Sequence, residues 1–173
     1  MGVTMVSLPL LLAALLILPG AAPRTLRLVP PQASLEMRAY AIGFLPIDSR
    51  FTRFDGTLTY DQAEPARCTA TLTAQVASLE TAKATMRETI LGADFLDAAQ
   101  FPTLGFTGTC TQAGTLAGSL TMRGVAHPLV LRLERSAHGL AAEGEVRRAL
   151  WGMDARPFMV GPMIRIRVTA PLP

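Results

Sequence analysis

The stretch SLETAKATMRETILGADFLDAAQFPTLGF, residues 78–106, decides the predicted architecture because it interrupts a chain that otherwise alternates like β-strands. Thr81 is expected to cap a helix of about three turns by accepting a hydrogen bond from a first-turn amide, and Gly92 to end it in a left-handed conformation. Met86 and Ile90 are four residues apart and therefore share one face of this helix. Two interpretations follow: a small helix that plugs the end of a core, or a lid over a pocket.

Alternation of apolar and polar residues with a period of two recurs on both sides of this helix, as in half-buried strands. The pattern predicts about eight short antiparallel strands, among them residues 34–40, 56–60, 68–76, 104–110, 120–123, 129–134 and 164–170. Closing such a sheet into a barrel removes its exposed edges. The interior is then either filled by side chains or lined around one small ligand, and inward residues as small as Ala74 and Gly108 are compatible with both.

Ordered motifs support a family resemblance. Residues 78–106 contain Ser-x-x-Thr, Arg-acidic-x-x-Leu, Asp-Phe-x-Asp and Phe-Pro-x-x-x-Phe in that order, and further motifs lie at residues 50–56, 118–125 and 148–153. Together they resemble the YceI-like family, secreted bacterial barrels of lipocalin-like shape that bind polyisoprenoid lipids. The resemblance implies one domain over residues 23–173, an eight-stranded antiparallel lipocalin-like β-barrel capped at one end by the short helix and a loop.

The resemblance also implies a ligand, an isoprenoid or quinone-like lipid held inside the barrel without catalysis. The predicted ligand-binding residues are the inward strand positions, the apolar face of the helix and two arginines that match the family pattern: Met37, Leu58, Tyr60, Leu72, Val76, Met86, Arg87, Ile90, Phe106, Leu120, Met122, Leu131, Arg148 and Ile166. Ala74 is expected to line the same tunnel, so that Ala74→Trp would block it while the fold persists. The alternative is a solid barrel that acts in stress protection or protein interaction and holds no lipid.

The two arginines have two interpretations. Arg87 lies beside the predicted lid and Arg148 is expected to open the penultimate strand, where a guanidinium would hydrogen-bond a quinone carbonyl or a phosphate head group. Alternatively, each arginine pins the lid through an ion pair with a nearby carboxylate of Glu88, Asp94 or Asp97.

Cys68 and Cys110 are predicted to form a disulfide. Cys68 starts the strand that leads to the helix, and Cys110 ends the strand that leads away from it. If these strands pair as antiparallel neighbours, the two cysteines lie nearly opposite each other on the inward face. The alternative is a pair of buried free thiols.

The N-terminal segment predicts export. Residues 5–18 are almost entirely apolar and small residues follow at 20–22, which is typical of a signal peptide over residues 1–22 that is cleaved near Ala22. The mature protein would then be periplasmic or secreted, with no stable membrane span. An uncleaved anchor is the alternative.

Other functional classes find little support in the sequence. The net charge of +3 is spread over many segments and forms no basic patch, so nucleic acid is not an expected partner. His127 and His138 are predicted to lie in surface turns, and neither has a partner at catalytic or metal-ligand spacing. We therefore expect no catalytic residue, no metal and no resident cofactor, and the sequence leaves a monomer or a homodimer open.

Overall fold

The computed structural model describes residues 22–61, 63–64, 66–112, 114–137 and 139–171. His138 and residues 1–21 of the signal peptide predicted over residues 1–22 therefore lie outside the described residues. The strands are β1 (Arg24–Arg27), β2 (Ser34–Ala41), β3 (Leu45–Phe51), β4 (Phe54–Tyr60), β5 (Cys68–Gln75), β6 (Leu79–Thr81), β7 (Thr103–Gln112), β8 (Thr115–Met122), β9 (Val125–Ser136), β10 (Gly139–Arg147) and β11 (Met163–Ala170). The helical segments are η1 (Val76–Ser78), α1 (Ala84–Leu91) and η2 (Arg148–Trp151).

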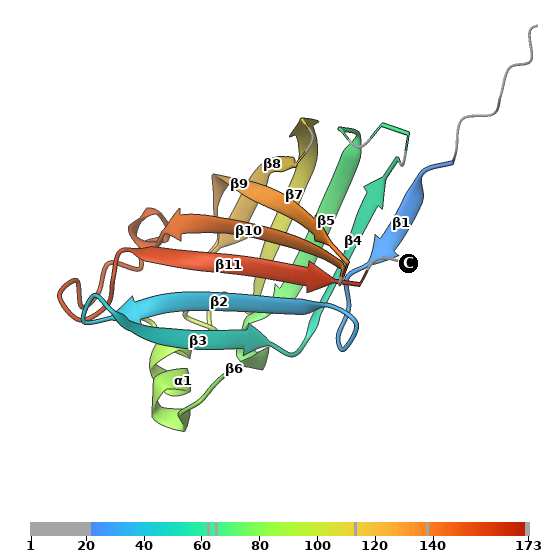
Figure 1. The fold of residues 1–173 in the computed structure, drawn as a ribbon. Coiled ribbons are helices and arrows are strands. Elements are labelled where there is room, and N and C mark those ends of the chain that lie inside the picture. The colour runs from blue at the N-terminus through green and yellow to red at the C-terminus, as the bar shows by residue number, and fades with distance from the viewer. Residues whose placement is uncertain (1–21, 62, 65, 113, 138, 172–173) are drawn as a thin grey trace, which may run out of the picture.

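All the described strands belong to one antiparallel sheet, in the order β1-β4-β5-β7-β8-β9-β10-β11-β2-β3-β6. The sheet curls into a barrel-like shape, with α1 and β6 beside β3 at one end (Figure 1). β3 and β4 lie near opposite edges of the sheet. Only Thr52 and Arg53 separate them in the chain, so this short segment connects the two edges. The amide of Gln75 donates to the Arg53 carbonyl at 3.0 Å and ties this corner to the end of β5. The prediction of an antiparallel, all-β, barrel-like fold is confirmed.

The predicted number of strands was wrong, because the described residues form eleven strands rather than eight. β1 and β6 contain only four and three residues, which is too short for alternation to stand out. β10 has the sequence GLAAEGEVR, whose small residues give little contrast between its two faces. β3 carries Pro46 and turns only its last few residues inward, so its pattern is also incomplete.

The predicted helix exists, but its ends differ from the prediction. α1 contains eight residues, about two turns rather than three. Lys83 occupies the N-cap position and makes no side-chain cap. Thr81 does not cap the helix, because it belongs to β6 and its hydroxyl donates to the Asp48 carbonyl at 2.7 Å. Gly92 follows the helix as expected, yet its φ of −73° is extended rather than left-handed.

The predicted disulfide between Cys68 and Cys110 is confirmed, with 4.9 Å between the two Cα atoms. β5 and β7 pair in a register that places Thr69 opposite Thr109, so the neighbouring cysteines also face each other. Cys68 is buried in the core and Cys110 packs against it. The bond joins the ends of β5 and β7 that lie away from α1.

Candidate functional site

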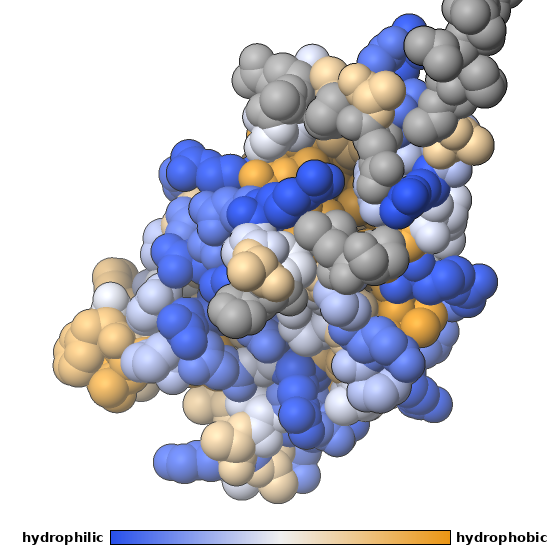
Figure 2. Space-filling view, turned by 45° about the vertical axis from the view of Figure 1, so that its right-hand side comes forward, coloured by the Kyte–Doolittle hydropathy of each residue, from blue (hydrophilic) through white to orange (hydrophobic). Residues whose placement is uncertain are grey.

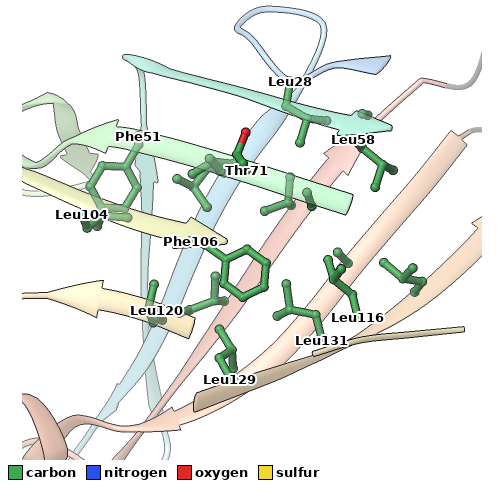
Figure 3. A pocket seen from close by; sticks show the side chains of 18 of the residues that line it. Leu28, Phe51, Leu58, Thr71, Leu104, Phe106, Leu116, Leu120, Leu129 and Leu131 are labelled. Atoms are coloured by element: carbon green, nitrogen blue, oxygen red, sulfur yellow. The ribbon is translucent and has the colours of Figure 1, made fainter. Parts of the chain in front are cut away.

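The barrel interior contains an apolar cavity of about 70 Å³, which we call the main cavity. Leucine supplies eleven of its twenty-one lining residues, so the wall is built mainly from branched side chains with several rotamers each. Figure 3 shows Phe106, Leu116, Leu120 and Leu131 directed into the same space from β7, β8 and β9. The full lining runs from Leu28 to Ala170 and therefore brings together residues that are far apart in the sequence.

No polar side-chain group of a described residue faces the main cavity. Among the described residues of its wall, Thr71 is the only polar one, and its hydroxyl is hydrogen-bonded to the Thr57 hydroxyl at 3.1 Å on the outer face of the sheet. A polar group placed inside would find no partner and would lose its bonds to water. The main cavity is therefore suited to hydrocarbon.

A second apolar cavity of about 70 Å³ lies at the end of the barrel against α1, and we call it the lid cavity. Met86 and Ile90 are half-buried and line it, as expected for the inner face of a lid. Met37 is the one described residue that lines both cavities. The side chain of Met37 therefore lies at the boundary between them.

Arg148 is a buried cation at the lid cavity, with 4% of its surface exposed. It opens η2 rather than a strand, which corrects the prediction. Its Nε donates to the Gly161 carbonyl at 2.9 Å, Nη2 to the Val160 carbonyl at 3.0 Å, and Nη1 to the Met153 carbonyl. Burial lowers the pKa of Arg148 from its ordinary value, and the charge of Asp154 opposes that shift.

Arg87 also bonds to backbone, and it lines neither cavity. Its Nε donates to the Leu79 carbonyl at 2.8 Å and Nη2 donates to the Ala77 carbonyl at 2.6 Å, which fastens α1 to η1 and β6. Among the described ion pairs, none joins Arg87 or Arg148 to a carboxylate. Arg87 thus pins the lid and Arg148 pins the segment between η2 and β11, both through carbonyl oxygens rather than the predicted acidic partners.

The remaining predicted ligand-binding residues fall into two groups. Those that line the main cavity are Met37, Leu58, Leu72, Phe106, Leu120, Met122, Leu131 and Ile166. Tyr60 and Val76 are buried in the core but line neither cavity. The prediction missed Phe51 on β3 and Leu140 and Ala142 on β10, because those two strands were not recognised.

Two small residues do not open the interior as expected. Ala74 is fully buried and lines neither cavity, so its side chain is packed. Gly108 lies opposite Gly118, and a Cβ atom on either glycine would come within 2.7 Å of the Phe106 ring. The Phe106 ring therefore fills the space that the two glycines leave.

His127 lies in β9 rather than in a turn, so the prediction for this histidine was wrong. Its Nε2 is 2.9 Å from the Leu150 carbonyl oxygen, and its ring meets the Trp151 ring edge to face with 5.0 Å between centroids. These contacts brace η2 against the sheet.

The described part of the chain contains no cluster of three or more His, Cys, Asp or Glu side chains able to hold a metal ion. Within that same part, no helix has the length and apolar character needed to cross a membrane.

Comparison with known proteins agrees with this architecture. A family model described as a YceI-like domain matches residues 26–172. The chain belongs to the YceI-like family. Protein YceI of Escherichia coli O17:K52:H18 is 30% identical over 111 residues, which cover 62% of this chain and 58% of that protein. A UPF0312 protein of Shewanella sp. (strain W3-18-1) is 29% identical over 125 residues, which cover 69% and 65%. These matches span less than two thirds of the length of either relative.

Solved structures share the fold of this chain. BcnA of Burkholderia cenocepacia superposes with a TM-score of 0.67 at 17% identity, covering 79% of this chain and 94% of that one. A polyisoprenoid-binding domain from Saccharophagus degradans, implicated in plant cell wall breakdown, gives a TM-score of 0.56 at 13% identity and covers 81% and 94%. At these identities the likeness establishes the fold alone.

Proposed function

We propose that this YceI-like barrel binds the apolar tail of an extended lipid, of the isoprenoid class, and performs no reaction on it. The observation that carries the proposal is the main cavity, whose wall presents no polar side-chain group from the described residues. The polyisoprenoid-binding domain of similar fold supports the isoprenoid class. Burying each methylene group of a tail contributes about 0.8 kcal/mol, so a long tail binds without many polar contacts.

The size of the cavities sets a condition on this binding. Each cavity, at about 70 Å³, is smaller than the cavity of roughly 150 Å³ that holds one benzene molecule. A tail of several isoprene units therefore requires the wall to rearrange and the two cavities to join. Met37 lies at their boundary, and methionine is the apolar side chain that adapts most readily to an irregular occupant.

The head group is proposed to contribute little to selectivity. Arg87 and Arg148 already donate to backbone carbonyls, and the described wall of the main cavity has no charged group. Selection would then depend on the length and shape of the tail. Binding of a quinone-like lipid would follow from its isoprenoid tail rather than from its ring.

The small volume of the main cavity favours one rival, a filled barrel that acts through its outer surface and holds no lipid. The two proposals make opposite predictions for what the purified protein carries. Lipid binding predicts one extractable lipid per chain, and the filled barrel predicts none.

The test is mass spectrometry of organic extracts from protein purified without detergent, with variants that fill or spare the main cavity. Ala70 lines that cavity, whereas the adjacent Thr69 faces solvent from the same strand. We expect Ala70→Trp to lose the lipid and Thr69→Trp to keep it. If Ala70→Trp fails to unfold cooperatively, Ala142→Phe fills the same cavity from β10. A folded cavity-filling variant that keeps the same lipid at the same occupancy refutes the proposal.

We also propose that the protein is exported to an oxidising compartment. The disulfide between Cys68 and Cys110 is the kind of bond that persists outside the cytosol, and the apolar segment before Ala22 has the pattern of a signal peptide. N-terminal sequencing of the exported protein is expected to begin within residues 20–24. Recovery of intact Met1 on membrane-bound protein would show an uncleaved anchor instead.

A further inference from the structure

Two loops meet at the end of the barrel near the lid cavity, and we call them the apolar tip: residues 41–45, between β2 and β3, and residues 156–161, before β11. Ala41 forms an antiparallel bridge with Val160. The Ile42 amide donates to the Met159 carbonyl at 2.9 Å. Figure 1 shows the two loops projecting together at the left. They therefore form one structural unit.

The apolar tip exposes large hydrophobic side chains to an unusual degree. The exposed fractions are 92% for Phe158, 71% for Phe44, 57% for Met159, 51% for Ile42 and 46% for Leu45. Figure 2 shows hydrophobic side chains on a projection at the left of the molecule, on the side where these loops lie in Figure 1. Single exposed hydrophobic residues are ordinary, but a contiguous group marks an interaction site.

The backbone holds these side chains outward. Arg148 donates to the Val160 and Gly161 carbonyls, and the Met159 amide donates to the Arg156 carbonyl at 3.0 Å. Ile42 has a φ of 47°, a left-handed conformation that β-branched residues rarely adopt. Such a conformation persists where the surrounding contacts impose it, and it is concentrated at functional positions.

The apolar tip adjoins the lid cavity. Ala39 and Ile47 line that cavity and pair across β2 and β3, two residues from the turn. Val160 lines the cavity and also belongs to the tip. An apolar path of a few residues therefore leads from the exposed side chains to the interior.

We propose that the apolar tip inserts into the surface of a lipid bilayer, so that lipid tails pass between the membrane and the lid cavity. This inference rests on the proposed function and names the source of its ligand. Five large side chains within eleven residues form a projection, whereas a stable protein interface takes roughly 20–30 residues on each side. The single charged residue of the two segments is Arg156, which is exposed and whose sign suits anionic head groups.

The test places a fluorescent reporter at the apolar tip of the full-length chain. Trp151 is the only native tryptophan and is 2% exposed, so it gives a constant background. Phe158→Trp and the control Val130→Trp both introduce an exposed tryptophan, the control on the outer face of β9. Vesicles of phosphatidylethanolamine and phosphatidylglycerol with brominated acyl chains quench tryptophans that reach the hydrocarbon. We expect strong quenching and a blue shift for Phe158→Trp and neither for Val130→Trp.

A double variant, Phe44→Ser with Phe158→Ser, tests the consequence of insertion. We expect its rate of lipid uptake from vesicles to fall at least tenfold, while the lipid retained after detergent-mediated loading stays at the wild-type level. Equal emission of the two tryptophan variants in brominated vesicles refutes insertion, as does an unchanged uptake rate. Loss of self-association in the double variant without any vesicle effect would identify a second copy as the occupant, and also refutes it. Absence of retained lipid together with normal insertion refutes only the proposed function.

Discussion

Arg148→Leu separates a structural role of this arginine from a role in binding a head group. The substitution keeps an apolar stem but removes the donors to the Met153, Val160 and Gly161 carbonyls. Those carbonyls lie in the segment that runs from η2 to β11, which includes one loop of the apolar tip. Loss of the three hydrogen bonds should therefore loosen that segment and destabilise the domain.

The expected magnitude follows from the three hydrogen bonds. A hydrogen bond to a charged group contributes about 1.5–3 kcal/mol, so the sum would be about 4.5–9 kcal/mol if nothing relaxed. Carbonyls that regain water when the loop opens lose less than this sum, and each one that stays buried without a donor costs about 1–3 kcal/mol. We expect the free energy of unfolding to fall by about 4 kcal/mol. With a urea dependence of about 2 kcal/mol per molar, the midpoint falls by about 2 M.

Urea denaturation with the disulfide intact measures this change. Arg147→Leu is the matched control, because Arg147 is exposed and its side chain makes no hydrogen bond or ion pair with another described residue. The control should change stability by no more than about 0.5 kcal/mol. Arg148→Lys keeps the charge but not the planar fork, and should fall between the two. A midpoint for Arg148→Leu equal to that of the control, with lipid lost, would refute the structural role and favour head-group recognition.

Three further outcomes are expected. Replacing Cys68 and Cys110 together by serine should lower the free energy of unfolding by about 4 kcal/mol in the chain-entropy model, as judged by urea denaturation with and without reductant. Gly118→Ala should cost about 1–3 kcal/mol because its Cβ would press on an aromatic ring and a backbone carbonyl, whereas Gly105→Ala, with no contact closer than 3.7 Å, should cost less. Met37→Ala should cost about 2–5 kcal/mol and join the two cavities, so that mass spectrometry finds longer tails retained; unchanged tail lengths would contradict the proposed boundary.

Alternation predicted the strands whose two faces differ clearly in polarity. β5 has the sequence CTATLTAQ, and its residues are buried and exposed in strict turn. Because β5 and β7 flank the helical stretch, their pairing also predicted the disulfide between Cys68 and Cys110. β10 was not predicted, because alanine and glycine occupy both of its faces and alternation in polarity is not visible where side chains hardly differ.

The arginine contacts were less accessible to sequence reasoning. Ion pairs between side chains have a signature in the order of charges, and on that basis Glu88, Asp94 and Asp97 were the expected partners. The actual acceptors are backbone carbonyls, which every residue carries, so only the fold reveals which of them converge on a guanidinium. The exposure of Phe158 and Phe44 was not predicted for a related reason, since an exposed aromatic residue and a buried one look alike in sequence.

The cavities themselves follow from side-chain packing rather than from the inward face as a whole. Ala74 and Gly108 both face inward, yet the space beside Gly108 holds the Phe106 ring and the space beside Ala74 is packed. Open volume remains instead where leucines of the adjacent strands β8, β9 and β10 line the barrel, and again beneath α1. The cross-link at Cys68 and the anchor at Arg148 hold regions far apart along the barrel, whereas Met37, between the two cavities, has neither constraint. Expansion around a long tail should therefore begin at Met37.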